Sequence, residues 1–170
     1  PYLIGIVMYD VLQNYIFEKN EIVIKWPNDI LVKKKKIAGS LIEMSTQGKQ
    51  IQDIVIGIGV NLKSSPYIYD YKTTYLEKES NVKTNTYKIL TQFIECFECW
   101  KKHLNHGDKN IKFIIDQWMK RSFVKGTLIK IKSENKIYNG LYDGIDLDGS
   151  IKLLIKKKAM KFNNVQTITS

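Results

Sequence analysis

Arginine is nearly absent from this sequence. Only one of its 27 basic residues, Arg121, is an arginine, and the others are lysines. Guanidinium groups suit bidentate recognition of phosphates and base edges, whereas the lysine ammonium is a hydrated point charge that replaces them poorly. The net charge of +10 therefore indicates a generic basic surface rather than a dedicated nucleic-acid face.

Cysteine and long apolar runs are also scarce. Cys96 and Cys99 lie three residues apart in a predicted helix, without the further Cys or His residues that a disulfide framework or a metal site would need. The longest apolar run near the N-terminus, Tyr2–Met8, is too short to span a membrane and lacks the flanks of a leader peptide. We expect a reducing compartment, either the cytoplasm or an organelle such as a plastid, and no membrane association.

Three apolar runs with many β-branched residues lie in the stretch Glu21–Leu62. Runs of this kind predict strands. Pro27 cannot extend a strand ladder and Asn28-Asp29 is typical of turns, so the chain should bend there. The predicted strands are Glu21–Trp26, Ile30–Lys33, Ile37–Met44 and Ile51–Leu62.

Helical patterns flank this predicted sheet. An amphipathic helix is expected over Leu3–Lys19, a second from a cap at Thr84 or Asn85 to about His103, and a third over Asn110–Arg121. Between them, the polar, tyrosine-rich connection Lys63–Lys83 has no regular pattern. Long connections of this kind inside a domain are often functional.

The pattern changes after Phe123. Short strands separated by polar turns predict a small β-barrel in the last fifty residues or fewer. We therefore expect an α+β fold in which a mixed sheet flanked by helices (residues 1–122) precedes a small barrel (residues 123–170). The strands predicted there are Thr127–Ser133, Lys136–Tyr142, Ser150–Lys156 and one near Met160–Phe162, with turns at 133–135 and 146–149.

Polar residues and glycines interrupt the strands of the first part at places where a small ligand could bind. Each has an ordinary explanation as well. Asn28 and Asp29 can simply close a turn, a lysine run can be a solvated hairpin tip, and a glycine in a strand can mark a bulge. Lys36 differs from the preceding lysines because the chain returns to an apolar run directly after it. The candidates are Lys25, Asn28, Asp29, Lys36, Gly39, Gly57, Gly59 and Asn61.

Taken together, these motifs resemble the biotin protein ligase family. Four segments occur in the family's order and spacing, and the C-terminal pattern resembles the family's SH3-like domain. The resemblance implies a class II synthetase-like catalytic fold, incomplete at its N-terminal side, followed by that SH3-like barrel. The four segments are Leu3–Leu12 (LIGIVMYDVL), Lys25–Asp29 (KWPND), Lys36–Glu43 (KIAGSLIE) and Gly57–Asn61 (GIGVN).

The resemblance implies a ligase that joins biotin to a lysine of a biotin carboxyl carrier domain. Biotin and ATP form biotinyl-5′-AMP with Mg²⁺, and the carrier amine then attacks this adenylate. Lys36 and Asp29 would be the catalytic residues, with Asp29 as a rival magnesium ligand. Biotin and the adenylate would contact Lys36, Gly39, Ser40, Gly57 and Gly59, and ATP would contact Asn28, Asn61 and Lys25.

One family feature is missing. The arginine- and glycine-rich loop that closes over biotin lies upstream of these motifs, and a chain with one arginine cannot contain it. We expect this chain to be the C-terminal portion of a longer ligase, with little or no ligase activity by itself. The resemblance also allows a homodimer.

Three other functions stay open. They are a lipoate–protein ligase with the same adenylate chemistry, a basic nucleic-acid-binding barrel, which is disfavoured, and a degenerate ligase kept as a scaffold.

Overall fold

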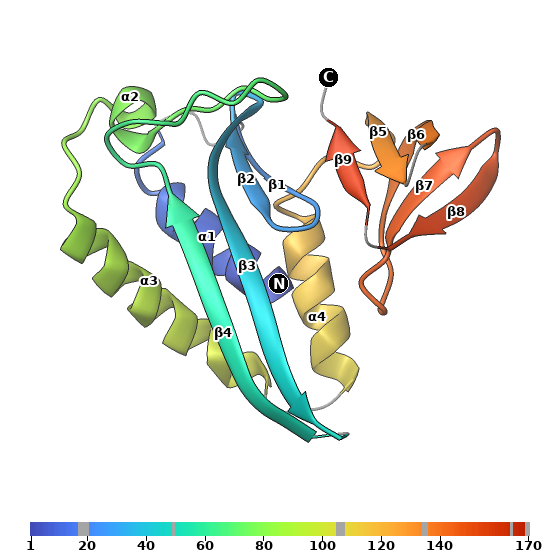
Figure 1. Ribbon diagram of the computed structural model, residues 1–170, viewed down its shortest axis with the longest axis horizontal. Coiled ribbons are helices and arrows are strands. Elements are labelled where there is room, and N and C mark those ends of the chain that lie inside the picture. The colour runs from blue at the N-terminus through green and yellow to red at the C-terminus, as the bar shows by residue number, and fades with distance from the viewer. Residues whose placement is uncertain (17–20, 49, 105–107, 134–135, 164, 169–170) are drawn as a thin grey trace.

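The computed structural model describes every residue except 17–20, 49, 105–107, 134–135, 164 and 169–170. Two antiparallel sheets lie side by side, with helices packed between and behind them (Figure 1). The expected α+β class is confirmed. No helix in the described part of the chain is long and apolar enough to cross a membrane.

The first sheet has the strand order β1-β2-β3-β4. The four predicted strands are confirmed, although β3 extends well beyond Met44 and forms with β4 a long hairpin. The expected mixed sheet is wrong for the described residues, because the strands of this sheet pair antiparallel throughout and parallel pairing is limited to two isolated bridges. The bounds are β1 Ile22–Lys25, β2 Asp29–Val32, β3 Lys35–Gln47 and β4 Gln50–Val60.

Helix α1 is shorter than predicted because it ends at Leu12, followed by a turn. The Asn14 side chain donates to the Asp10 carbonyl at 3.1 Å, and such local bonds compete with helix continuation. The predicted extension to Lys19 falls partly outside the described residues. Asn85 caps α3 as expected, since its side chain accepts from the backbone N–H groups of Tyr87 and Lys88. The helices are α1 Tyr2–Leu12, α2 Leu76–Ser80, α3 Thr86–Lys101, the short 3₁₀ helix η2 Lys102–Leu104, and α4 Asp108–Met119.

The second sheet has the strand order β8-β7-β6-β5-β9. All four strands predicted after residue 123 are present, and β9 was not predicted. The predicted turn at 146–149 is confirmed, whereas the one at 133–135 lies mostly outside the described residues. The bounds are β5 Leu128–Ser133, β6 Lys136–Ile145, β7 Ile151–Ile155, β8 Lys158–Phe162 and β9 Gln166–Ile168.

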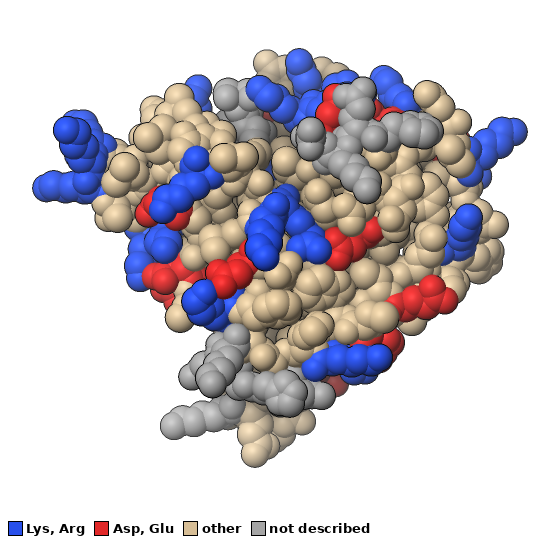
Figure 2. Space-filling view, turned by 180° about the vertical axis from the view of Figure 1, so that it is seen from behind, with Lys and Arg blue, Asp and Glu red and all other residues tan. Residues whose placement is uncertain are grey.

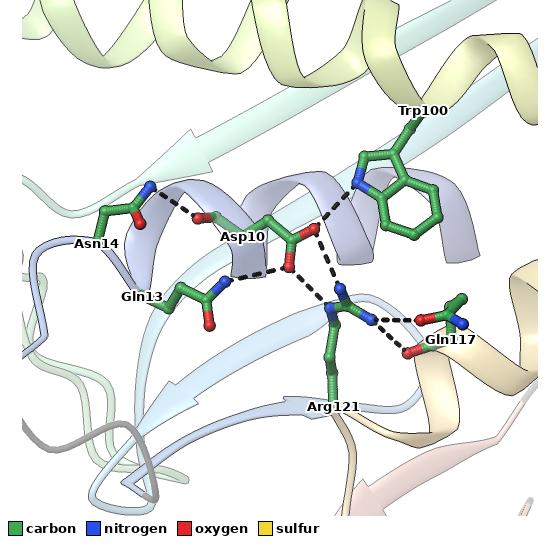
Figure 3. Close-up of polar contacts among 6 residues, drawn as sticks. All are labelled: Asp10, Gln13, Asn14, Trp100, Gln117 and Arg121. Atoms are coloured by element: carbon green, nitrogen blue, oxygen red, sulfur yellow. Dashed lines mark hydrogen bonds and ion pairs between the residues drawn. The ribbon is translucent and has the colours of Figure 1, made fainter.

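The single arginine joins three helices to the first sheet (Figure 3). The Arg121 guanidinium donates to both carboxylate oxygens of Asp10 in α1, at 2.8 and 3.2 Å, and also to Gln117 in α4. Asp10 accepts a further bond from the Trp100 indole of α3 at 3.0 Å. The Arg121 carbonyl in turn accepts from the Ile24 N–H of β1. This bidentate pair therefore holds the strand that leads directly into Lys25–Asp29.

The second sheet touches the same motif from its other side. The carbonyl of Gly149, in the turn before β7, accepts from the Tyr2 hydroxyl and, at 3.2 Å, from the Trp26 indole N–H. Gly149 has a φ of +86°, and a Cβ there would lie 3.1 Å from the Tyr2 oxygen. Any larger residue would be strained and would push this contact apart. The second sheet thus braces the first at Trp26.

Strand β4 is exposed along almost its whole length, on both faces. Its apolar side chains include Ile51 and Val55, which are 58% and 59% exposed, and Leu41 and Met44 of β3 are equally open. Continuous apolar strands are usually buried on both faces. The helices instead cover the sheet near β1, β2 and the first half of β3, where the core lies.

Candidate active site

A β-bulge brings Lys36 and Asp29 together. In the β2–β3 pairing Ile30 lies opposite Ala38, but Leu31 lies opposite Lys36, so Ile37 is an extra residue. Because side chains alternate along a strand, one extra residue moves every residue beyond it to the other face. Lys36 consequently lies on the same face as Gly39, and its Nζ is 2.6 Å from Asp29 Oδ1.

The Lys36–Asp29 ion pair is partly shielded from water, with the two side chains 29% and 18% exposed. Lys36 Nζ also lies over the Tyr71 ring, 5.5 Å from the ring centroid. A lysine held in this way offers a fixed positive charge at one point of the surface. Lys34, two residues earlier, lies at the exposed hairpin turn. The geometry therefore agrees with the prediction that Lys36 differs from the lysines that precede it.

Three glycines lie on strands β3 and β4 beside the Lys36–Asp29 ion pair. Gly39 lies opposite Gly59, and Gly57 opposite Leu41, across the β3–β4 ladder. A Cβ on Gly39 would meet Asp29 Oδ1 at 2.9 Å and Lys36 Nζ at 3.2 Å, so only glycine leaves the ion pair undisturbed. At Gly57 and Gly59 an added Cβ would meet nothing closer than 3.7 Å. Because these two glycines have no side chains, open space remains above the sheet.

That space is a cavity of about 340 Å³. Its walls contain the predicted residues Asn28, Asp29, Lys36, Gly39, Ser40, Gly57, Gly59 and Asn61. The volume lies within the range of small-molecule sites. Of the predicted site residues, Lys25 alone is not among those that line it.

Both asparagines of the site are anchored to backbone. Asn28 Nδ2 donates to the Ser40 carbonyl, and Asn61 Nδ2 donates to the Thr74 carbonyl at 2.9 Å. One donor hydrogen of each amide is therefore used, which fixes the orientation of the remaining polar groups toward a ligand. The Ser40 hydroxyl is buried without a hydrogen-bond partner in the described part of the chain.

Four residues of the connection between β4 and α2 line the cavity and were not predicted individually: Pro66, Ile68, Tyr71 and Thr73. The connection runs beside Lys36 as a short parallel bridge, with Lys36 N–H donating to the Lys72 carbonyl and Thr74 N–H donating to the Lys36 carbonyl. The length of the segment was the one signal that sequence offered.

Lys25 is half-buried and lies opposite Asp29 in the β1–β2 ladder. Burial lowers the pKa of its ammonium from 10.5, Asp29 opposes this shift, and Lys36 adds to it. Because the folded pKa lies below the unfolded one, the unfolded chain binds more protons between the two values. Stability therefore rises with pH through that window.

We expect Lys25→Met to increase the free energy of unfolding near neutral pH, because it removes a desolvated charge. The difference from the parent protein should narrow as the pH approaches 10, and urea unfolding at several pH values measures it. A variant that is less stable than the parent at neutral pH would contradict this interpretation and show that the electrostatic attraction to Asp29 outweighs desolvation.

No group of three or more His, Cys, Asp or Glu side chains suited to a metal ion occurs in the described residues. Asp29 is the single carboxylate among the cavity-lining residues, and it is already paired with Lys36. A protein-held magnesium site does not fit this donor set, because Mg²⁺ needs several oxygen ligands and would lie beside an ammonium group.

Comparison with known proteins gives consistent results. The model of the Biotin/lipoate A/B protein ligase family matches residues 2–61. The Bifunctional ligase/repressor BirA of Bacillus subtilis is 30% identical over 135 residues, covering 76% of this chain and 41% of that protein. The Biotin--[acetyl-CoA-carboxylase] ligase of Paracoccus denitrificans is 27% identical over 158 residues, covering 89% and 65%. The chain thus spans less than two thirds of either relative.

Solved structures show the same fold. The biotin protein ligase from Aquifex aeolicus in complex with biotin and ATP has a TM-score of 0.81 at 19% identity, covering 100% of this chain and 71% of that one. Both sheets and the helices between them therefore recur together in a known architecture.

Proposed function

Because this chain belongs to the biotin protein ligase family, we propose that the full-length protein attaches biotin to a lysine of a biotin carboxyl carrier domain. The main observation behind this proposal is the Lys36–Asp29 ion pair beside a cavity that is lined in part by glycines. Support comes also from the relatives, one of which is named as an acetyl-CoA-carboxylase ligase and one of which was solved with biotin and ATP.

In the first step the carboxylate oxygen of biotin attacks the α-phosphorus of ATP. The new P–O bond forms as the bond to pyrophosphate breaks, giving biotinyl-5′-AMP. Two anions must approach, and negative charge grows on the phosphoryl oxygens. A fixed cation offsets both effects. We assign this role to Lys36, which the bulge and Tyr71 hold at the cavity wall.

In the second step the neutral amine of the carrier lysine attacks the acyl carbon. The amide bond forms, AMP leaves, and the nitrogen loses a proton. A carboxylate at this point can orient the amine and accept that proton. We assign this role to Asp29, and its position at the cavity next to Lys36 supports the assignment. Gly39, Ser40, Gly57 and Gly59 would lie under biotin and the adenylate.

We assign Asn28 and Asn61 to the recognition of adenine. Each would use the amide donor and acceptor groups that its backbone contact leaves free. Lys25 is not among the residues that line the cavity, and it is assigned a supporting role opposite Asp29 in the β1–β2 ladder. Magnesium is assigned mainly to the triphosphate of ATP, and Asp29, the one carboxylate that lines the cavity, keeps the rival role of an additional oxygen ligand.

We also propose that the chain comprises a catalytic portion, residues 1–122, and an SH3-like domain, residues 123–170. The exposure of β4 on both faces supports the view that further protein covers the sheet in the complete enzyme. The carrier protein, a homodimer and the reducing compartment remain predictions.

The test is biotin-dependent exchange of pyrophosphate into ATP, followed by transfer of biotin to a carrier domain, with the full-length protein. Exchange with biotin and none with lipoate is expected. Preference for lipoate would replace the proposal by the lipoate ligase alternative, which the family model also includes. The 170-residue chain assayed in parallel should have little or no activity, and robust transfer by it would refute that expectation.

A further inference from the structure

A second depression, the lysine groove, adjoins the cavity. It has a volume of about 770 Å³ and is lined by Lys33–Lys35 at the β2–β3 turn, by residues 67–73 of the following connection, and by Lys78 of α2. Ile68, Tyr71 and Thr73 line both depressions. The lysine groove is therefore continuous with the rim of the proposed active site.

The lysine groove is strongly basic. Its lining has five lysines and a single acid, Asp70. Lys33 is paired with Glu21 and Glu79. The other four have no acidic partner within 4.0 Å in the described part of the chain, and three of them, Lys34, Lys72 and Lys78, are exposed. In Figure 2 basic side chains gather along the upper edge, the end at which the β2–β3 turn lies in Figure 1.

The β2–β3 turn, which contributes Lys33 and Lys34 to the lysine groove, has an unusual backbone conformation. Lys33 and Lys34 have φ values of +50° and +63°. Two-residue hairpin turns with two positive φ angles favour Asn-Gly, because a Cβ costs energy there. The β7–β8 turn has the same geometry, with Lys156 and Lys157 at +49° and +64°. The second sheet therefore provides a matched lysine turn that is not part of the lysine groove.

Aromatic side chains accompany the charges. Tyr67 and Tyr69 are 91% and 90% exposed, although tyrosine normally buries its ring. Tyrosine is enriched at protein–protein interfaces, and complementary charge beside such residues steers a partner of opposite charge. Tyrosines and charges arranged in this way are less suited to a polyphosphate, which needs donors that converge on one point rather than charges spread along an open groove.

The proposed reaction requires a protein at this position. The acceptor lysine must reach the adenylate with its own short side chain, so the carrier domain must rest on the rim of the cavity. We propose that the lysine groove docks an acidic surface of the carrier domain, with Lys34, Lys72 and Lys78 providing the steering charge. This inference rests on the proposed function and adds the partner's docking surface to it. Complementary charge mainly raises the rate of productive encounter.

The experiment uses the full-length enzyme and the carrier domain encoded in the same genome. The groove variant is Lys34→Glu, Lys72→Glu and Lys78→Glu, and the control is Lys156→Glu, Lys157→Glu and Lys158→Glu, which has the same change in net charge. We expect kcat/KM for the carrier domain to fall by about tenfold or more in the groove variant at low ionic strength, and to approach the parent value at high salt.

Steps that do not need docking should be unaffected. Biotin-dependent pyrophosphate exchange and the transfer of biotin to hydroxylamine, a small nucleophile, should match the parent enzyme in both variants. Lys→Gln changes at the same three groove positions provide a milder set, which should give a smaller loss in the same direction if the Glu variant folds poorly.

Other outcomes would overturn the inference. An equal loss in the control would show an effect of net charge alone, and an unchanged kcat/KM in the groove variant would show no docking there. A raised KM for ATP or pyrophosphate would assign the lysine groove to polyphosphate. If the groove variant lost only duplex DNA binding, the partner would be a nucleic acid. If the parent enzyme shows no biotin-dependent exchange, the proposed function itself has failed, which is visible before any variant is compared.

Discussion

Lys36→Ala in the full-length enzyme is expected to reduce biotin-dependent pyrophosphate exchange by about 10²–10³-fold, the loss typical when a fixed group that stabilises transition-state charge is removed. The cation is held 2.6 Å from Asp29, and Lys36 is the one lysine among the residues that line the cavity, so its removal takes the ammonium group away from the cavity wall. Single-turnover formation of biotinyl-5′-AMP measures the effect directly.

Lys34→Ala is the matched control. It removes the same side chain from the same hairpin, two residues away, at an exposed turn. Exchange should stay close to the parent rate. Thermal unfolding of Lys34→Ala should match the parent, whereas Lys36→Ala should lower Tm, because it leaves the largely buried Asp29 carboxylate without its partner. Equal losses of exchange in the two variants would show that the functional lysine has been misplaced.

The sequence predicted every described strand of the two sheets except β9, because β-branched runs bounded by Gly, Pro, Asn and Asp are strong local signals. It also gave Lys36 and Asp29 as candidate site residues, through the family resemblance of their motifs. It could not predict that they meet, because the extra residue Ile37 arises from pairing between β2 and β3. A bulge depends on the partner strand, and no local pattern encodes it.

The less accurate predictions also concern tertiary effects. The apolar pattern of the first helix continues past Leu12, but the Asn14 side chain and the following turn end it there. The sequence of the connection after β4 shows no regular pattern, because its residues Lys72 and Thr74 form their backbone hydrogen bonds with Lys36, which is distant in the sequence. Tyr71 therefore entered the site through a contact that periodicity does not report.

Gly39→Ala is expected to separate the role of the ion pair from the stability of the sheet. The added methyl group would lie 2.9 Å from Asp29 Oδ1 and 3.2 Å from Lys36 Nζ. Both atoms are the ends of side chains that can move, so the free energy of unfolding should change by less than about 1 kcal/mol. The ion pair itself must shift, and a displacement of about 1 Å in a catalytic group can reduce the rate by about 10²-fold.

Gly59→Ala is the control on the opposite strand. Its Cβ would meet the Gly39 carbonyl oxygen at 4.0 Å, an ordinary contact, and leave Lys36 and Asp29 in place. It should therefore raise KM for biotin by narrowing the space above the sheet, with a much smaller change in kcat for adenylate formation. Gly39→Ala should mainly lower kcat. If Gly39→Ala instead unfolds the protein in proportion to its loss of activity, Gly39 serves the packing of the sheet, and the ion pair tolerates displacement.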